Sequence, residues 1–197
     1  MKKIAVFASG NGSNFQAILD ATKNGEMNAS MQLLVCDRPN AFCIERASQA
    51  GVPSFVFSAK NYESKKQYET EVIAHLKELN VEFIILAGYM RLIGPTILDA
   101  FPGKIVNIHP SFLPLFPGKD AIGQALQAGV ESTGVTVHFV DEGMDTGPII
   151  AQEKILIENG DSKESLEQKV HEIEHVLYVN TLKKLFRRCG LYAQMHN

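Results

Sequence analysis

The sequence predicts an α/β fold: a Rossmann-like open sheet of mostly parallel strands, with helices on both faces and a long C-terminal helix. Two observations predict this fold. Short apolar runs alternate with segments of helical period in the first half, which is typical of parallel strands buried on both faces and joined by covering helices. The segment 162–187 keeps a helical period throughout, and we expect Asp161 or Ser162 to cap it.

The first half of the chain alternates regularly between the two kinds of segment. Its apolar runs have the length of strands, and its helical segments carry apolar residues three and four positions apart. The predicted strands cover 3–8, 31–36, 54–57 and 83–87, and the predicted helices cover 14–23, 41–50 and 62–79.

The second half contains three further apolar runs, separated by a proline-rich stretch and by a loop of acids and glycines. The predicted strands cover 105–109, 133–140 and 149–157, with a short helix at 120–128 and the acidic loop at 141–147. No internal repeat, low-complexity segment or linker divides the sequence. We therefore expect a single domain over 1–197.

Composition and charge exclude several functional classes. The 197 residues include 19 basic and 22 acidic side chains, a formal net charge of −3, which argues against binding of nucleic acid through phosphate contacts. No segment approaches the ~20 apolar residues of a membrane span. Cys36, Cys43 and Cys189 contain no C-x-x-C pair, and such a set fits a reducing compartment. We expect a cytoplasmic protein without nucleic-acid or membrane partners.

A glycine-rich loop, 10–14, lies between the first predicted strand and the first predicted helix. It is not a dinucleotide fingerprint, because Phe15 stands at the third glycine position. Asp37 stands where a ribose-binding acid is found in such proteins, but a turn residue is the better interpretation. Glycines and free N–H groups at a helix start favour a phosphate. A tight turn capped by Ser13 or Asn14 remains the alternative.

The stretch 107–110, Asn-Ile-His-Pro, is the most informative in the sequence. Residues two apart in a strand share a face, so Asn107 and His109 project together while Ile108 points the other way. Pro110 cannot continue a central strand, which puts the pair near the carboxyl end, where open parallel sheets bind ligands. The alternative is a buried pair that is satisfied by neighbouring backbone.

Asp145 makes a catalytic interpretation more attractive. It lies in the glycine-containing segment 142–147, which can fold over the strand end. An aspartate beside a histidine stabilises the imidazolium. Together, Asn107, His109 and Asp145 offer an amide donor, a charged donor and an acid–base partner, a set that suits acyl transfer. No G-x-S-x-G accompanies them, so we expect the nucleophile to belong to the substrate.

Four stretches in order along the chain resemble the glycinamide ribonucleotide formyltransferases of purine synthesis, within the folate-dependent formyltransferase superfamily. The Asn, His, Asp set marks the superfamily, whereas the glycine loop and the Met-Arg-Leu segment indicate the narrower family. The four stretches are 10–14, 87–92, 107–114 and 141–147.

This resemblance implies a role for each matching residue. Asn107 and His109 stabilise an oxyanion and Asp145 assists, while the substrate phosphate and ribose contact Gly12, Ser13, Asn14, His171 and Glu174. The folate contacts Lys65, Met90, Arg91, Leu92, Ile93, Asn107, Val140, Asp141, Glu142 and Asp145. Lys65 stands where some relatives carry Arg, which puts a bidentate grip on the folate carboxylate in doubt.

The implied reaction transfers the formyl group of 10-formyltetrahydrofolate to the amine of glycinamide ribonucleotide, by direct amine attack and without a metal. The partners are these small molecules, and the chain is a monomer or homodimer. The half 1–100 binds the nucleotide, and the half 101–197 carries the folate and catalytic residues. Two alternatives stay open: a formyltetrahydrofolate deformylase or another amine formyltransferase of the superfamily, and a non-catalytic phosphate-binding α/β module.

The last helix contains a literal H-E-x-x-H at 171–175, which binds zinc in metalloproteases. We discount a zinc site, because no acid follows His175 as a third ligand. The helix has an apolar stripe, and we expect both histidines on the opposite, solvated face. His138 is interpreted as structural, and His196 as part of a frayed tail. The stripe is Leu166, Val170, Ile173, Leu177 and Thr181.

Overall fold

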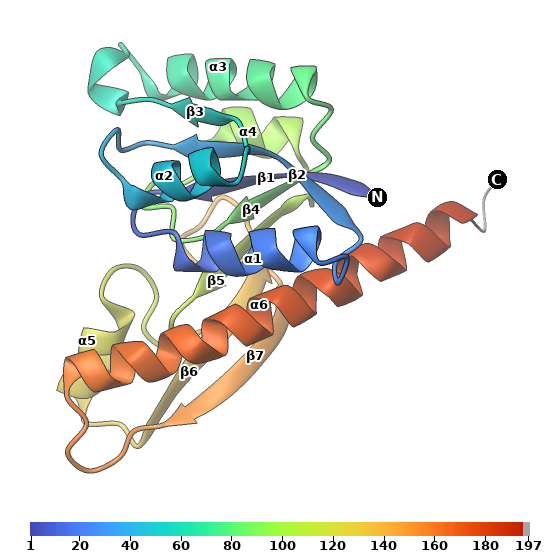
Figure 1. Cartoon of the computed structure of the whole chain (residues 1–197). Coiled ribbons are helices and arrows are strands. Elements are labelled where there is room, and N and C mark those ends of the chain that lie inside the picture. Colours follow the sequence, from blue (N-terminus) through green and yellow to red (C-terminus); the bar gives the residue numbers. More distant parts are fainter. Residues whose placement is uncertain (195–197) are drawn as a thin grey trace.

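The structure is a computed structural model that describes residues 1–194, with side chains up to residue 187. His196 and the side chain of Cys189 lie outside this part. Seven strands form one sheet in the order β3-β2-β1-β4-β5-β6-β7 (Figure 1). The strands are β1 Lys2–Ala8, β2 Ala29–Cys36, β3 Ser54–Val56, β4 Phe83–Leu86, β5 Ile105–His109, β6 Ser132–Phe139 and β7 Ile149–Leu156.

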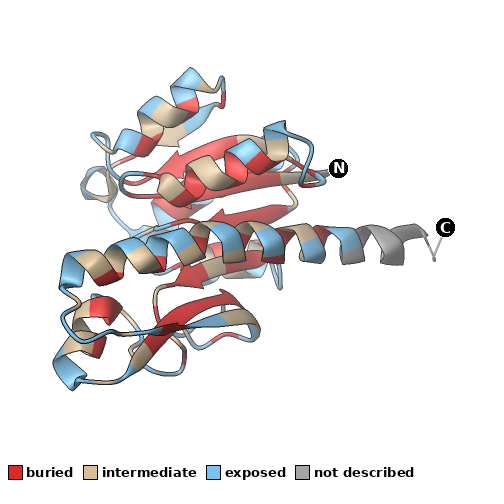
Figure 2. Ribbon diagram, turned by 60° about the horizontal axis from the view of Figure 1, so that its bottom comes forward, coloured by how far each residue is buried: buried red, intermediate tan, exposed pale blue. Residues whose placement is uncertain are grey.

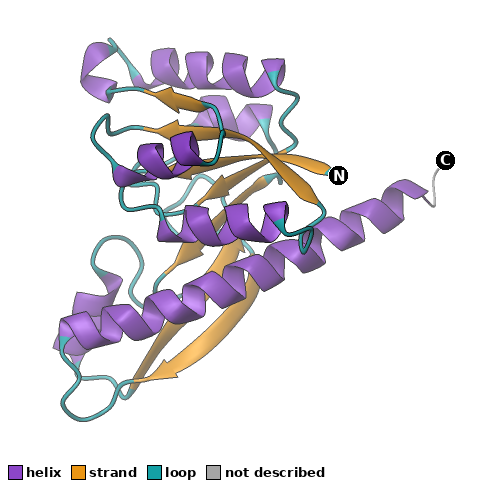
Figure 3. Ribbon diagram, viewed as in Figure 1, coloured by secondary structure: helices purple, strands orange, loops and turns teal. Residues whose placement is uncertain are grey.

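Helices connect most of these strands (Figure 3). The strands β3, β2, β1, β4 and β5 pair in parallel, because helical crossovers return the chain to the same edge of the sheet. β6 and β7 add two antiparallel strands at one side. The helices are α1 Ser13–Lys23, α2 Phe42–Gln49, α3 Lys65–Glu78, α4 Pro95–Ala100, α5 Ala121–Ala128 and α6 Lys163–Gln194, with a 3-10 turn η1 at Ala59–Asn61.

Apolar side chains fill both faces of the sheet, and its central strands are buried, as their red colour in Figure 2 shows. One core lies under α1, α2 and α6 and contains Phe15, Tyr178 and Phe186. The other lies under α3 and α4 and contains Phe7 and Val72. Successive residues of each buried strand point to opposite cores, which is why the strands are apolar throughout. The predicted fold class is confirmed.

Three details differ from the prediction. The structure adds α4, which is too short to show a helical period and which begins with Pro95 at its first position. α3 begins at Lys65 rather than at residue 62, because the Ser64 hydroxyl accepts a hydrogen bond of 3.2 Å from the Gln67 N–H and caps the helix.

The third difference is the buried stripe of α6. It repeats every four residues, through Leu166, Val170, Glu174, Tyr178, Leu182 and Phe186. The predicted stripe shares Leu166 and Val170 with it, and Thr181 is also buried, but the predicted Ile173 and Leu177 are only partly buried beside it. The reason is that a buried glutamate and a tyrosine interrupt the apolar pattern. The Tyr178 hydroxyl lies 2.9 Å from the Leu86 carbonyl and 3.0 Å from that of Val106, which satisfies it in the core.

Among the described residues, no helix is both long enough and apolar enough to cross a membrane.

Candidate active site

β5 carries the predicted pair at the carboxyl edge of the sheet. Asn107 and His109 share the face of Ile105, whereas Val106 and Ile108 belong to the opposite core. The antiparallel register sets His138 of β6 directly opposite Asn107. Cross-strand partners lie on one face, so three polar side chains from two strands converge there.

Asp145 completes this group from the loop after β6. Its Oδ2 lies 3.4 Å from His109 Nδ1, and its Oδ1 lies 3.5 Å from Asn107 Nδ2. His109 Nε2 lies 2.8 Å from the Phe116 carbonyl oxygen. Both ring nitrogens of His109 thus face acceptors, an arrangement that suits the doubly protonated imidazolium. The structure brings the predicted trio together.

The Asp145 carboxylate is held in its charged form. Burial raises its pKa, but the hydrogen bond from the Gly118 N–H and the positive charge of His109 lower it further, so that the net shift is downward. The Gly118 N–H donates to Oδ2 at 2.8 Å. Asp145 has φ 58°, a left-handed conformation that aspartate tolerates, and Phe116 has φ 55°, which a bulky residue rarely adopts outside functional or strained sites.

His138 joins this group, although the sequence predicted only a structural role for it. Its Nε2 lies 3.2 Å from Asn107 Nδ2 and 3.6 Å from Asp145 Oδ1. The alternation of buried Val135 and Val137 with Thr136 and His138 was a usable signal for its face. The register with β5 was not readable from the sequence, because it depends on how the two strands pair.

The glycine loop forms the start of α1. Gly12 has φ 78°, and a Cβ there would lie 2.6 Å from the Cβ of Cys43. Within the described part of the chain no side chain caps α1, so the expected alternative, a cap by Ser13 or Asn14, is not observed. The Arg46 guanidinium donates to the Asn11 carbonyl and side-chain oxygens at 2.9 Å each, which fixes the loop. Free N–H groups at this helix start can bind an anion.

Glu174 reaches this loop from α6. It is buried, and its Oε2 accepts from Asn14 Nδ2 at 3.1 Å and contacts His171 Nδ1 at 2.8 Å. The hydrogen bond to Glu174 raises the pKa of His171. Asn14 Oδ1 is buried and has no hydrogen-bond partner in the described residues, which leaves an acceptor for a ligand donor. The five predicted substrate residues therefore form one group.

His175 departs from the prediction of a solvated face. It is half-buried, and its Nε2 is buried without a partner in the described residues, because it lies beside the buried stripe through Glu174. Burial lowers the pKa of His175. Across the side chains described, to residue 187, no three His, Cys, Asp or Glu residues gather as metal ligands would.

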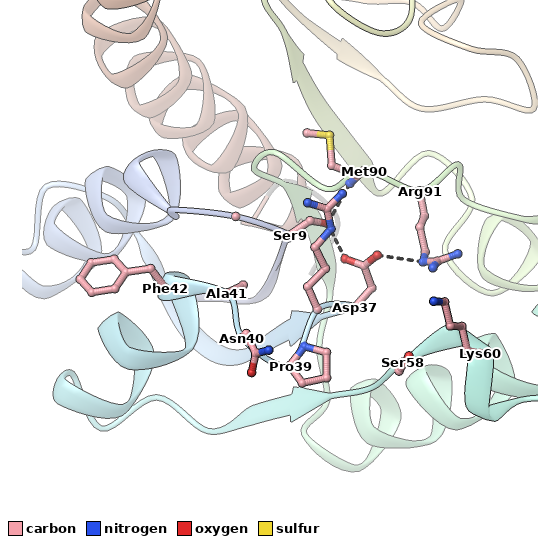
Figure 4. Close-up of a pocket in the computed structure, with 12 residues that line it drawn as sticks. Ser9, Asp37, Pro39, Asn40, Ala41, Phe42, Ser58, Lys60, Met90 and Arg91 are labelled. Atoms are coloured by element: carbon pink, nitrogen blue, oxygen red, sulfur yellow. Dashed lines mark hydrogen bonds and ion pairs between the residues drawn. The ribbon is translucent and has the colours of Figure 1, made fainter.

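A cleft of about 720 Å³ lies beside the glycine loop, at the ends of β1 and β2 (Figure 4). Asp37 is buried at its base, where the Ser9 hydroxyl and Arg91 Nε donate to its two oxygens, the latter at 2.8 Å. The Met90 N–H donates to Ser9 Oγ at 2.9 Å. Both carboxylate oxygens of Asp37 therefore have partners within the chain. Asp37 links the ends of β1 and β2 to the loop after β4.

A second cleft, of about 510 Å³, shares Met90 and Arg91 with the first. Lys65 and Leu92 also line it, with two tyrosines, Tyr62 and Tyr68. Four of the predicted folate residues thus lie together at an aromatic, cationic surface.

The other predicted folate residues lie elsewhere. Ile93 is buried in the core under α3 and α4, and Val140 packs against the same core. The Asp141 carboxylate orders its own loop, because it accepts from the Gly143 N–H at 3.1 Å and from Thr146 Oγ1 at 2.7 Å. Glu142 is exposed.

Comparisons with known proteins define the class of protein to which this chain belongs. The family model described as formyl transferase matches residues 2–182. The chain belongs to this formyl transferase family, as its resemblance implied.

Individual relatives narrow the class further. Phosphoribosylglycinamide formyltransferase of Bacillus subtilis (strain 168) is 57% identical over 185 residues, which cover 94% of this chain and 95% of that protein. Glycinamide ribonucleotide transformylase 1 from Geobacillus kaustophilus has a crystal structure with a TM-score of 0.92 and 61% identity, covering 94% of this chain and 98% of that one. The phosphoribosylglycinamide formyltransferase structure from Bacillus halodurans has a TM-score of 0.92 and 52% identity, covering 93% and 95%.

Proposed function

We propose that this chain transfers the formyl group of 10-formyltetrahydrofolate to the amine of glycinamide ribonucleotide, a step of purine biosynthesis. The observation that carries the proposal is the convergence of Asn107, His109 and Asp145 at the sheet edge of a formyl transferase family member. This set can stabilise charge and accept or return a proton, but it contains no nucleophile of its own.

The second cleft suits the folate end of the donor. Its tyrosines and Leu92 offer a surface for an aromatic ring, and Lys65 and Arg91 offer positive charge for a carboxylate. Arg91 already gives its Nε to Asp37, so it meets the carboxylate through its other nitrogens.

The acceptor is expected to lie along the glycine loop and α6. The N–H groups at the start of α1 bind its phosphate, because they are aligned and carry partial positive charge. Glu174 and the free oxygen of Asn14 accept hydrogen bonds from its ribose or its amine.

The chemical step is an attack of the acceptor amine on the formyl carbon. The carbonyl electron pair moves onto oxygen, and the oxyanion accepts hydrogen bonds from Asn107 Nδ2 and from protonated His109. Collapse breaks the bond to the folate nitrogen, and the proton lost by the amine reaches that nitrogen with the help of Asp145. His109 Nε2 donates to the Phe116 carbonyl in this structure, so we expect the substrate to replace that contact. The left-handed backbone at Phe116 favours its release.

We place this reaction in the cytoplasm. Cys36 and Cys43 are free, buried thiols whose sulfur atoms lie 3.7 Å apart, which fits a reducing compartment.

Release of tetrahydrofolate from 10-formyltetrahydrofolate tests the proposal, measured with and without glycinamide ribonucleotide. We expect release that depends on the amine and equals the formylated product. Release at the same rate without the amine would identify a deformylase. No release under either condition would leave only the phosphate-binding module.

A further inference from the structure

His138 is buried and has two ring nitrogens with different surroundings. Nδ1 lies 2.7 Å from the Phe139 carbonyl oxygen, which can only accept a hydrogen bond, so Nδ1 carries a proton. In the neutral ring Nε2 is then an acceptor. Its nearest polar neighbour is Asn107 Nδ2 at 3.2 Å, which can donate to it, whereas Asp145 Oδ1 at 3.6 Å lies beyond hydrogen-bond distance.

The amide of Asn107 has two possible orientations, and its neighbours select between them. With Nδ2 towards β6, one N–H points to His138 Nε2 and the other lies on the side of Asp145 Oδ1, at a long 3.5 Å. With the amide flipped, its oxygen would face both an imidazole lone pair and a carboxylate. Two acceptors facing a third in a buried site are strongly unfavourable.

We propose that His138 is a positioning residue, which as a neutral ring protonated at Nδ1 orients the Asn107 amide so that its second N–H points at the reacting oxygen. The weak contact to Asp145 leaves this N–H available to an oxyanion. This inference rests on the proposed function, because it assigns Asn107 the same role. His138 itself touches no substrate in this scheme.

Two substitutions separate positioning from simple structural support, because each replaces the ring by an amide that reaches the position of only one ring nitrogen. The amide of H138Q can put its oxygen near the position of Nε2 and still accept from Asn107. The amide of H138N can donate near the position of Nδ1 to the Phe139 carbonyl but offers no acceptor to Asn107. If His138 orients Asn107, H138Q keeps its activity and H138N loses most of it.

We expect H138N to lower kcat by about 30-fold, short of the ~10²- to 10³-fold loss on removing an oxyanion donor outright. The KM values for both substrates should stay within about twofold, since no binding contact changes. H138Q should keep kcat within about threefold of the parent. T133V is the matched control: Thr133 is buried on β6, its hydroxyl has no partner in the described residues, and kcat should not change.

A double-mutant cycle with N107A completes the test. If His138 acts through Asn107, H138N should cost no more than about twofold in the N107A background. An equal loss in both backgrounds, or a more active H138N than H138Q, would overturn the inference. The proposed function fails separately, if the parent chain itself forms no formylated amine. Melting temperatures and near-UV circular dichroism of each variant verify the fold.

Discussion

The two sides of the candidate site are built from different parts of the fold. On one side, Asn107, His109 and His138 lie on paired strands, and their positions follow from the register of β5 and β6. On the other side, Lys65, Met90 and Leu92 lie on a helix start and a loop, and Met90 and Leu92 are more than half exposed. Strand pairing fixes side chains closely, whereas long exposed side chains adapt to a ligand. Substitutions on the strand side should therefore change kcat, and those on the loop side should change KM.

The largest effect is expected at His109 and Asp145. H109A and D145N should each lower kcat by about 10³-fold, because each removes a charged group from the proton-transfer network. KM should rise by no more than about threefold if the strand side serves chemistry alone. Steady-state kinetics for both substrates measure this split. D99N, at an exposed carboxylate of α4, is the control and should match the parent. A D145N variant with near-parental kcat would show that the loop carrying Asp145 takes no part in the mechanism.

The anchor of the loop side is expected to give the next effect. Asp37 holds Arg91 and, through Ser9, the Met90 N–H. D37N removes the charge that pairs with Arg91, and the loop carrying Met90 to Leu92 loses an anchor. We expect KM for the donor to rise about tenfold, with kcat within about threefold. The free energy of unfolding should fall by about 1–2 kcal/mol, discounted because Arg91 is partly exposed.

The result for D37N sharpens the comparison, because Asp37 lies under the loop side and outside the strand group. A loss of kcat with unchanged KM would contradict the division. It would show that the loop after β4 positions the reacting atoms as strictly as the strands do.

The glycine loop offers a test with a built-in control. Gly12 has a left-handed φ, and an added Cβ would meet Cys43, so G12A should destabilise the fold by about 1–3 kcal/mol and displace the start of α1. KM for the phosphate-bearing acceptor should rise more than KM for the donor. Gly10 has no left-handed φ and no heavy atom of the described chain within 4 Å of an added Cβ, so G10A should change the stability of the fold very little. Urea unfolding and kinetics compare the two. Equal effects would mean that the loop needs flexibility rather than one conformation.

The sequence predicted the positions of Asn107 and His109 on the strand side better than those of the residues around them. Asn107 and His109 were placed on one face because a period of two is enough for that inference. Asp145 was placed by chemistry and resemblance, since no local pattern fixes where a loop folds. The contact of His138 with Asn107 was not predicted, because it depends on the pairing of β5 with β6. The resemblance named Glu174 as a substrate residue. Its burial was not predicted, because the apolar stripe expected along α6 did not include it. The contacts of Asp37 with Ser9 and Arg91 were not predicted, because these residues are distant from it in the chain.

The smallest effect is expected in the pH dependence of stability on the acceptor side, which is the group formed by Asn14, His171 and Glu174. Glu174 raises the pKa of His171 above its usual 6.5. A histidine whose pKa rises on folding stabilises the protein fully below the unfolded pKa, and this stabilisation is lost as pH rises through the folded value. H171Q should therefore destabilise the fold more at about pH 5.5 than at about pH 8.5, where both states are neutral. Because the side chain is 55% exposed, we expect only a few tenths of a kcal/mol, measured by urea unfolding.

Salt separates this electrostatic effect from packing. At about 1 M salt the Debye length falls to about 3 Å, so the pH-dependent part of the H171Q difference should shrink, whereas any loss of packing should remain. A difference that grows with pH would mean that folding favours the neutral ring of His171 and that Glu174 serves Asn14 alone. The acceptor side would then resemble the strand side, because the fixed hydrogen bond between Asn14 and Glu174 would matter and the exposed pair of His171 with Glu174 would not.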